Sequence, residues 1–408
     1  MDSLTNNGRL LDHAMIGSAG ALLGALATVS GAFLVVRPNR VQSGEGLTGF
    51  DAFGQAGWIL LAAWIALLAL SLVPLRFPSA TRFAAAARGL LAALLLPAVL
   101  LASSAAAQRL AQSAGDLARV SFGMSFWLAV LGLYFVLFSS AAVLHGLVVG
   151  RAITLIVPLS VIGLVVTGAL DRLSIMVEYA NAHRAFWDNF WQHVGYTLGT
   201  TGIALVLGIA LGVWAAKRGY AKSAVFGVLN LAQVMPALAF VGLLIVPMGW
   251  LRDNVPLARE LGVAGIGWAP VFVVLLFYAL FPITRNTFTA IRTLDAGIVD
   301  AARGMGMGAF RRIVAIELPL AAPVVLAGVR IALVQTAAGA IIAALVGGGG
   351  LGRIVFYGVE QTAEDLVLLG VIPIVVLGLS FDTLMRFAAA ALERAGGLSV
   401  ADTEGAGT

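Results

Sequence analysis

Long apolar stretches without a formal charge constrain the fold of this chain more than any other feature of its sequence. In the first half, Asp, Glu, Lys and Arg are absent from residues 14–36, 52–75, 89–108, 120–150 and 152–170. Because a helix rises about 1.5 Å per residue, each stretch can cross a hydrocarbon core of about 30 Å. The fourth stretch exceeds one span and must include loop residues. With 60% hydrophobic and 11% charged residues, a water-soluble globule is excluded.

The second half of the chain repeats this pattern. Further spans are expected at about residues 194–216, 224–248, 269–289, 322–346 and 366–390. Residues 171–193 separate the two sets of five and are polar and aromatic, and Trp187 and Trp191 suit a membrane interface. The sequence therefore predicts an all-α, polytopic membrane protein with about ten transmembrane helices.

The basic residues act as topology signals. The net charge of +5 comes from Arg and Lys scattered between apolar runs, so nucleic acid is not an expected partner. If both termini are cytoplasmic, the inner segments hold more Lys and Arg than the outer ones, which favours that orientation. The first stretch is too long for a signal-peptide core and indicates an uncleaved span. The chain has no cysteine, and its four histidines lack metal-ligand spacing, so no metal site is expected.

One long segment between apolar runs, Asp300 to Pro319, is suited to meet a soluble partner. Asp300 can cap the start of a helix, because its carboxylate accepts hydrogen bonds from unpaired backbone N–H groups. Three glycines at 304, 306 and 308 then interrupt that helix, and Leu318-Pro319 ends the segment before the next apolar run. A surface helix that merely links two membrane spans explains the same residues.

This segment resembles the cytoplasmic "EAA" loop of ABC importer permeases. The matching residues are Asp300, Ala301, Ala302, Gly306, Ile316, Leu318 and Pro319. Asp300 stands where that family usually has Glu, a departure that keeps the charge. The resemblance implies that a coupling loop at 291–319 docks on a separate ABC ATPase subunit. It also implies a second permease subunit, identical or homologous, and an extracytoplasmic solute-binding protein.

A closer likeness covers residues from about Tyr196 to Arg394. This part resembles permeases that import glycine betaine, choline and related osmoprotectants, on the stretches 230–236, 280–287 and 347–352. The N-terminal half, including residues 37–46, resembles a subset of these permeases with additional N-terminal helices. The resemblance implies a multi-pass protein of the bacterial inner membrane.

The expected domain organisation follows from the spans and the resemblance together. It comprises an N-terminal extension of about five helices at 1–170, a periplasmic connector at 171–193, a type I permease core at 194–394 and a disordered cytoplasmic tail at 395–408. The glycine run 347–350 is followed by no Lys-Ser or Lys-Thr, and the chain contains no P-loop. We therefore expect a transporter subunit, not an enzyme, with no cofactor and with ATP hydrolysis in the partner.

Two of the last five spans carry a charge well inside the span. Arg330 and Asp382 each lie about 16 to 18 Å from the cytoplasmic end of their helix, at about 1.5 Å per residue, so they share a depth. Isolated charges in a bilayer are costly, which suggests that the two form an intramembrane ion pair. Two alternatives explain the same residues. Arg330 can snorkel to the membrane surface while an unrelated Asp382 lines water, or Asp382 can pair with Arg285 in place of Arg330.

Polar residues in the core spans are candidates for the translocation pathway: Asn230, Gln233, Pro236, Gln335 and Thr336. The first two share a helix face, and Pro236 is expected to break that helix and expose backbone carbonyls to a cavity. Hydrogen bonding between packed helices explains the same residues.

Three kinds of transport protein remain compatible with this pattern. The first is an ABC importer permease, and the second is an ion-coupled carrier with five plus five inverted repeats. The halves show no internal similarity, and the segment after residue 290 has no counterpart after residue 76, which counts against the carrier. The third is a scaffold subunit without a pathway of its own.

Overall fold

The structure is a computed structural model that describes residues 2–39, 42–114 and 118–395. The predicted tail lies outside these residues, apart from its first position. The described chain is almost entirely helical, which confirms the all-α prediction. Ten helical segments in the described part are long and apolar enough to cross a membrane: Asp12–Val29, Gln55–Arg76, Pro78–Gln112, Met124–Val143, Val148–Val166, Ser174–Lys217, Ala237–Asn254, Trp268–Thr293, Ala309–Val346 and Glu364–Leu392.

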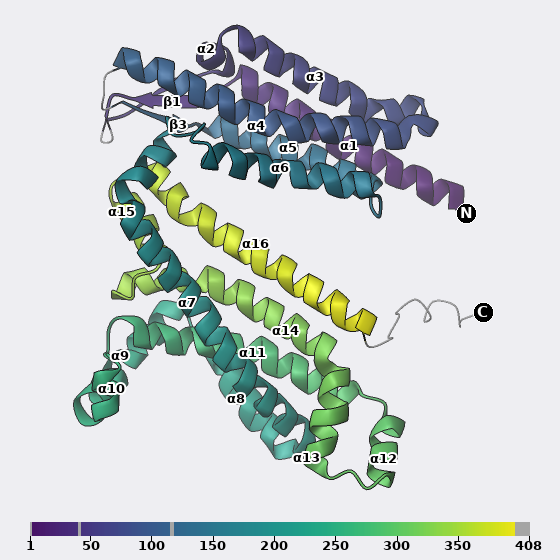
Figure 1. The fold of residues 1–408 in the computed structure, drawn as a ribbon, viewed down its shortest axis with the longest axis vertical. Helices are drawn as coiled ribbons and strands as arrows, with labels where there is room; N and C mark the ends of the chain where they lie inside the picture. Colours follow the sequence, from purple (N-terminus) through teal and green to yellow (C-terminus); the bar gives the residue numbers. More distant parts are fainter. Residues whose placement is uncertain (1, 40–41, 115–117, 396–408) are drawn as a thin grey trace. The chain divides into compact units, whose positions relative to one another are not determined.

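The chain divides into two compact units, Met1–Asn181 and Ala182–Thr408. The long helices of the N-terminal unit lie side by side (Figure 1). They are α1 (Asp2–Val29), α3 (Gln55–Arg76), α4 (Thr81–Ala114), α5 (Met124–Val143) and α6 (Val148–Val166), with the short α2 (Gly49–Phe53) and η1 (Pro78–Ala80) between them. Helix α1 packs most extensively against α5 and α3.

The contact between α1 and α5 requires glycine on both helices. A Cβ atom on Gly20 would lie 2.5 Å from the carbonyl oxygen of Gly132, and a Cβ atom on Gly132 would lie 2.5 Å from the carbonyl oxygen of Gly20. One turn after Gly20, the ring of Trp64 occupies the place of a side chain on Gly24. Small residues thus let the helix backbones meet directly, as is common between membrane helices.

A small antiparallel sheet, in the order β2-β1-β3, lies at one end of the helices of this unit (Figure 1). Strand β1 (Leu34–Arg37) pairs with β2 (Glu45–Leu47) and with β3 (Arg119–Phe122). The first apolar stretch, 14–36, is therefore helical only as far as Val29, and the stretch 120–150, which was expected to include loop residues, begins in β3. Gly31, with φ +75°, turns the chain out of α1, and the β-branched and aromatic residues that follow favour strands.

The C-terminal unit is built around α11 (Trp268–Thr293), which packs against α14 (Leu318–Gly339), α8 (Gly219–Val234) and α9 (Ala237–Asn254). Helix α14 also packs against α16 (Glu364–Ala395). The shorter elements are α10 (Pro256–Glu260), α12 (Ala296–Gly304), α13 (Ala309–Arg312), the π-helical turn η2 (Ile313–Glu317), the 3₁₀ segment η3 (Ala340–Val346) and α15 (Gly352–Glu360).

Two of the predicted spans differ from the helices observed. The sixth is part of α7 (Ser174–Lys217), so most of the polar segment expected as a connector is helical and continuous with the span. The seventh, expected at 224–248, is broken between α8 and α9, where Met235 and Pro236 are not helical. Proline disfavours a helical conformation in the residue before it, which explains the break.

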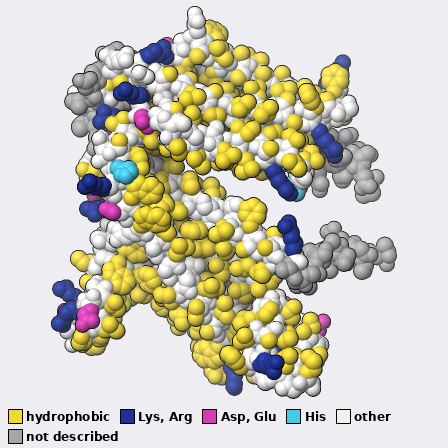
Figure 2. Space-filling view, in the orientation of Figure 1, with side chains coloured by type: hydrophobic (Ala, Val, Ile, Leu, Met, Phe, Trp, Pro, Cys, Tyr) yellow, Lys and Arg dark blue, Asp and Glu magenta, His cyan; other side chains and the backbone are white. Residues whose placement is uncertain are grey.

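Hydrophobic side chains cover much of each unit on the face that Figure 2 shows. On α6, for example, Leu155, Leu159 and Ile162 are all exposed. Apolar surfaces of this extent are stable in contact with lipid and not with water. The surface is therefore that of a multi-pass membrane protein.

Candidate coupling and translocation sites

The predicted coupling segment begins with a capped helix, but Asp300 is not the cap. Helix α12 starts after Asp295, whose carboxylate accepts a hydrogen bond of 2.6 Å from the backbone N–H of Gly297. Asp300 lies inside the helix, with its carboxylate 2.9 Å from the guanidinium of Arg303. The predicted cap is wrong because only two residues separate the new helix from the end of α11, and Asp295 is the residue in the N-cap position.

The glycines of this segment form the turn between α12 and α13. Gly304 is the last residue of α12, Gly308 is the N-cap of α13, and Gly306 between them has φ +78°. Apart from Gly306 itself and its two neighbours in the chain, no heavy atom lies within 4 Å of the position that a Cβ atom on Gly306 would occupy. The backbone conformation, and not close packing inside this chain, therefore favours glycine at 306.

The segment does not end at Leu318-Pro319 as expected. Helical structure continues from α13 through η2 into α14, with Pro319 in the first turn of α14. Proline has no N–H and therefore removes one hydrogen bond from the preceding turn, and a π-helical turn is one way to accommodate this. The coupling segment and the following span are therefore one continuous helical element.

A buried charged cluster joins this element to α7. The Glu317 side chain is fully buried, with one carboxylate oxygen 2.6 Å from Lys217 Nζ and the other 3.0 Å from Arg312 Nε. Lys217 is the last residue of α7, and Glu317 is the last residue of η2. Sequence reasoning missed this cluster, although an acidic residue inside the matched motif was a signal.

The intramembrane charges are in contact. Arg330 Nε on α14 donates a hydrogen bond to Asp382 on α16. The second carboxylate oxygen of Asp382 accepts from Arg386 Nε at 2.8 Å. Sequence reasoning missed Arg386 as a partner, although its spacing of four residues from Asp382 on one helix was a signal. The cluster is only partly buried and contains two cations for one carboxylate.

Two of the candidate pathway residues meet beside the break at Pro236. Gln335 Nε2 lies 3.4 Å from Gln233 Oε1, and Gln233 Nε2 donates to the Tyr278 carbonyl at 3.0 Å. The Tyr278 hydroxyl in turn donates to the Met235 carbonyl at 2.7 Å. That carbonyl, freed by the helix break, is therefore bonded to α11 and does not face an empty cavity.

The other two polar candidates lie apart from this pair. Asn230 is exposed on α8. Thr336 is fully buried, and its hydroxyl lies 3.1 Å from the Thr201 hydroxyl of α7, so it contributes to helix packing. The structure thus brings Gln233 and Gln335 together and leaves Asn230 and Thr336 outside their contact.

The glycine run 347–350 is held tightly against α7. Gln192 Nε2 and the Tyr196 hydroxyl both donate to the Gly348 carbonyl, at 2.8 and 2.5 Å. Gln192 Oε1 accepts from the Gly350 N–H at 3.0 Å. A Cβ atom on Gly349 would lie only 2.1 Å from Gln192 Oε1. The run is a close-packed turn, and sequence reasoning did not identify Gln192 or Tyr196 as its partners.

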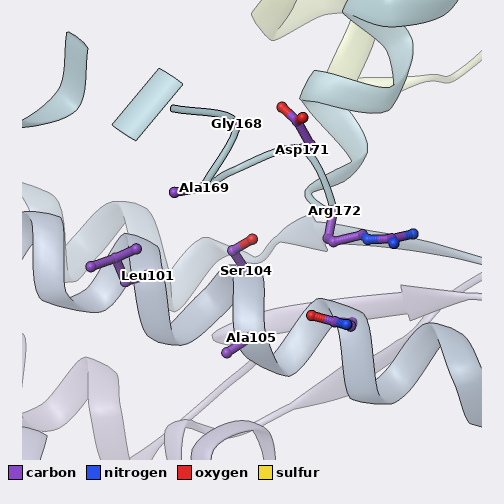
Figure 3. Close-up of a pocket in the computed structure, with 8 residues that line it drawn as sticks. Leu101, Ser104, Ala105, Gly168, Ala169, Asp171 and Arg172 are labelled. Carbon is purple, nitrogen blue, oxygen red and sulfur yellow. The ribbon is translucent and has the colours of Figure 1, made fainter. Parts of the chain in front are cut away.

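A polar cavity of about 640 Å³ lies in the N-terminal unit (Figure 3). In the figure, Ser104 rises from α4 toward the turn that carries Gly168 and Ala169. Asp171 and Arg172 bring a carboxylate and a guanidinium to the same cavity. An apolar cavity of about 340 Å³ lies in the C-terminal unit, between α7, α8 and α11. Neither of these two cavities is lined by the candidate pathway residues.

The C-terminal half of the chain matches a known protein family. Residues 208–394 match the family described as "binding-protein-dependent transport system inner membrane component". The choline transport system permease protein OpuBB of Bacillus subtilis (strain 168) is 30% identical over 206 residues, which are 50% of this chain and 88% of that protein. This chain therefore belongs to the family of binding-protein-dependent transport system inner membrane components. It is therefore a transport permease subunit and not an enzyme.

Other relatives of the permease have related names. The carnitine transport permease protein OpuCD of Listeria monocytogenes is 31% identical over 220 residues, 53% of the permease and 91% of that protein. The osmoprotectant import permease protein OsmW of Salmonella typhimurium (strain LT2) is 32% identical over 196 residues, 48% and 86% of the two chains. A chain of the MetNI methionine ABC transporter in an inward-facing conformation is 20% identical, with a TM-score of 0.43, and the match covers 51% of the permease and 98% of that chain.

The N-terminal unit has a family match of its own. Residues 15–176 of the permease match the family described as "ABC transporter permease YehY, N-terminal domain". The two family matches cover separate parts of the chain, and each falls largely within one of the two compact units.

Proposed function

We propose that this permease forms the membrane pathway of an ATP-driven importer for an osmoprotectant such as glycine betaine, choline or a related quaternary amine. The observation that carries the proposal is the match to the choline permease over 88% of that protein's length. The relatives named for carnitine and for osmoprotectants support the same class of solute.

The coupling segment supports a docked ATPase, because it exposes apolar side chains on both sides of the turn between α12 and α13. Met305 and Phe310 are 69% and 80% exposed, and Ile298 on α12 is also exposed. Arg303 and Arg311 lie among them and are exposed as well. Apolar residues rimmed by charged ones are typical of a protein interface. In this proposal the α12–α13 turn sits in a groove of the ATPase, with Gly306 at the closest approach.

Movement of the ATPase is passed to the spans through the buried cluster and the continuous helix. A force on α13 reaches α7 through Glu317 and Lys217, and it reaches α14 through η2 without a break in the helix. From α14, the contact of Arg330 with Asp382 extends the connection to α16. Rigid helices linked by charge pairs can move as one body, which alternating access requires.

The solute pathway is proposed to run beside the helix break at Pro236. Gln233, Gln335 and Tyr278 come from three different helices of the core and offer amide and hydroxyl groups there. Broken helices at the midplane of transporters commonly mark the substrate site. Neutral polar groups suit a solute that carries no net charge, so they favour the zwitterion glycine betaine over the cation choline.

The remaining partners and the orientation complete the proposal. Two permease subunits, identical or homologous, enclose the pathway, and a solute-binding protein delivers the solute from outside the bacterial inner membrane. Both termini and the coupling segment face the cytoplasm, where the ATPase is located. Antibody labelling of a tag at the C-terminus in intact and in permeabilised cells tests this orientation.

The experiment that tests the proposal is uptake of labelled glycine betaine or choline into proteoliposomes. We expect uptake only when the permease is reconstituted with its ATPase, ATP inside the vesicle and the binding protein outside. An ion-coupled carrier would transport the solute on a sodium or proton gradient without these partners. Uptake driven by such a gradient by the permease alone would overturn the proposal.

A further inference from the structure

The apolar cavity of the C-terminal unit is a groove that opens at the surface of the helices. It has a volume of about 340 Å³ and is lined by hydrophobic residues of α7, α8 and α11. Among these, Val225 and Leu229 are buried, whereas Trp214 and Val228 are 43% and 58% exposed. The groove therefore leads from the surface to the interior, and its volume is that of a small-ligand pocket.

The groove lies at the depth of the hydrocarbon core, close to its edge. Helix α7 is long and apolar enough to cross a membrane, and it ends at Lys217. At about 1.5 Å per residue, Trp214 lies about 5 Å from that end, and Val228 lies about 14 Å from the start of α8. The exposed rings of Trp214 and Tyr220 are 6.1 Å apart, and such aromatic side chains are enriched at membrane interfaces. One end of the groove therefore meets the lipid headgroups, and the rest meets acyl chains.

Two cations without a counter-charge lie at the headgroup end of this groove. Arg218 follows α7 directly, and Lys222 lies in the first turn of α8. Both are exposed, and no ion pair in the described part of the chain involves either of them. Lys222 Nζ lies 5.6 Å from the centroid of the Phe288 ring on α11, a contact that leaves its charge in place. The neighbouring Lys217 differs, because Glu317 neutralises it.

No acidic side chain of the lining helices can serve as the missing counter-charge. Helices α8 and α11 contain no Asp or Glu, and the acidic residues of α7, Glu178 and Asp188, lie near its other end. Basic residues near a membrane surface attract anionic lipids, and basic pockets between membrane helices bind anionic headgroups. An occupant with one negative group and a long apolar chain fits both parts of the site. A free anion would leave the groove empty, and an apolar helix of a partner would leave the cations uncompensated.

We propose that an anionic phospholipid, such as phosphatidylglycerol, binds in this groove. Its phosphate lies between Arg218 and Lys222, and one of its acyl chains lies against Trp214 and Val228. The lipid contacts α7, α8 and α11 together, so it holds α8 against the other two helices. The site is separate from the pathway proposed beside Pro236, and it does not depend on which solute is transported.

The first test removes the two charges. Full-length permease is purified in detergent, depleted of lipid and titrated with phosphatidylglycerol or with phosphatidylcholine of the same acyl chains, and bound lipid is counted by native mass spectrometry. We expect phosphatidylglycerol to bind about tenfold more tightly than phosphatidylcholine, because two basic groups act on one headgroup. Arg218→Gln with Lys222→Gln should abolish that preference. Arg252→Gln with Arg353→Gln, which removes two exposed cations outside the groove, is the matched control and should retain it.

The second test fills the groove and leaves the charges in place. Ala224 lines the groove and is exposed, so Ala224→Phe places a ring in the space proposed for the acyl chain. We expect the affinity for phosphatidylglycerol to fall about tenfold. Gly227→Phe is the control on the same helix, because Gly227 does not line the groove. Apart from its chain neighbours and the backbone of its own helix, a Cβ atom on Gly227 meets nothing within 4 Å.

The proposal is overturned by equal affinity of the wild type for the two lipids, or by phosphatidylglycerol binding that is unchanged in the charge variant or in Ala224→Phe. Occupation of the groove by a second copy of the permease would also overturn it. That occupation would appear as a loss of dimers in Ala224→Phe in the absence of added lipid. Every substituted residue is exposed, so the variants are expected to fold.

Discussion

Lys217 Nζ and Glu317 Oε2 lie 2.6 Å apart, joining the last residue of α7 to the π-helical turn that leads out of the coupling segment. Arg312 approaches the other oxygen of the same carboxylate. The Glu317 side chain is fully buried, so each cation is held by a group that water does not reach. The cluster therefore holds α7 and η2 in a fixed position relative to each other. It differs from a surface ion pair, whose contribution to folding stability is usually small.

Glu317→Gln is therefore expected to damage both stability and coupling. Removal of the carboxylate leaves Arg312 buried without a counter-charge, which should cost about 3 kcal/mol in unfolding free energy measured with denaturant in detergent. Uptake per ATP hydrolysed should fall as well. Asp300→Asn is the matched control, because its pair with Arg303 is exposed and should contribute less than about 1 kcal/mol. Equal losses of unfolding free energy in the two variants would contradict the structural role of the buried cluster.

The contact of Arg330 with Asp382 predicts a second set of results. Asp382→Asn should lower the thermal unfolding midpoint and the yield of assembled transporter, because it leaves Arg330 and Arg386 close together without an acidic partner. Exchange of the charges, Arg330→Asp with Asp382→Arg, should restore only part of the yield. Arg386 then faces a second arginine on its own helix, one turn away. A double variant no better than Asp382→Asn would count against the pair.

The number of membrane-spanning segments and the all-α fold class could be predicted from the sequence, because both depend on long, nearly continuous apolar runs. Sequence reasoning missed the strand Leu34–Arg37, since three apolar residues shortly after a long apolar helix carry no separate period. It also placed the start of the coupling helix at Asp300, where Asp295 offered the same cap chemistry closer to the end of the preceding helix. Two acidic residues of equal capping ability cannot be ranked without the backbone path.

The contacts of the candidate site could be predicted from the sequence only where a residue has few possible partners. Charged residues are rare in apolar spans, so a depth argument was enough to select Arg330 and Asp382, which the structure places in contact. Glu317 and Lys217 lie at the ends of elements that are distant in sequence, where many basic residues compete as partners. Likewise, nothing in the sequence around Gln192 indicates that its side chain is hydrogen-bonded to the glycine turn at 347–350.

Gly306 offers a test of the docking role that separates conformation from contact. Gly306→Ala introduces a side chain at φ +78°, which should cost about 1 kcal/mol in local strain while leaving the surface small. Gly306→Asp adds bulk and charge at the same position, and we expect it to abolish solute-stimulated ATP hydrolysis at normal expression. Gly304→Asp, at a helical position with open surroundings, is the control for charge alone. Full uptake by Gly306→Asp would contradict the proposed close approach.

The glycine turn at 347–350 gives a prediction in which backbone strain and packing can be separated. Gly347 and Gly349 have φ of +76° and +75°, so alanine should cost about 1 kcal/mol of strain at either position. A Cβ atom on Gly347 meets nothing within 4 Å, whereas one on Gly349 overlaps the Gln192 amide. Gly349→Ala should therefore lower the unfolding midpoint well beyond Gly347→Ala. Gln192→Ala removes the overlap, so the double variant Gly349→Ala with Gln192→Ala should lose less than the two single changes added together. Strict additivity would mean that Gln192 does not close on this turn.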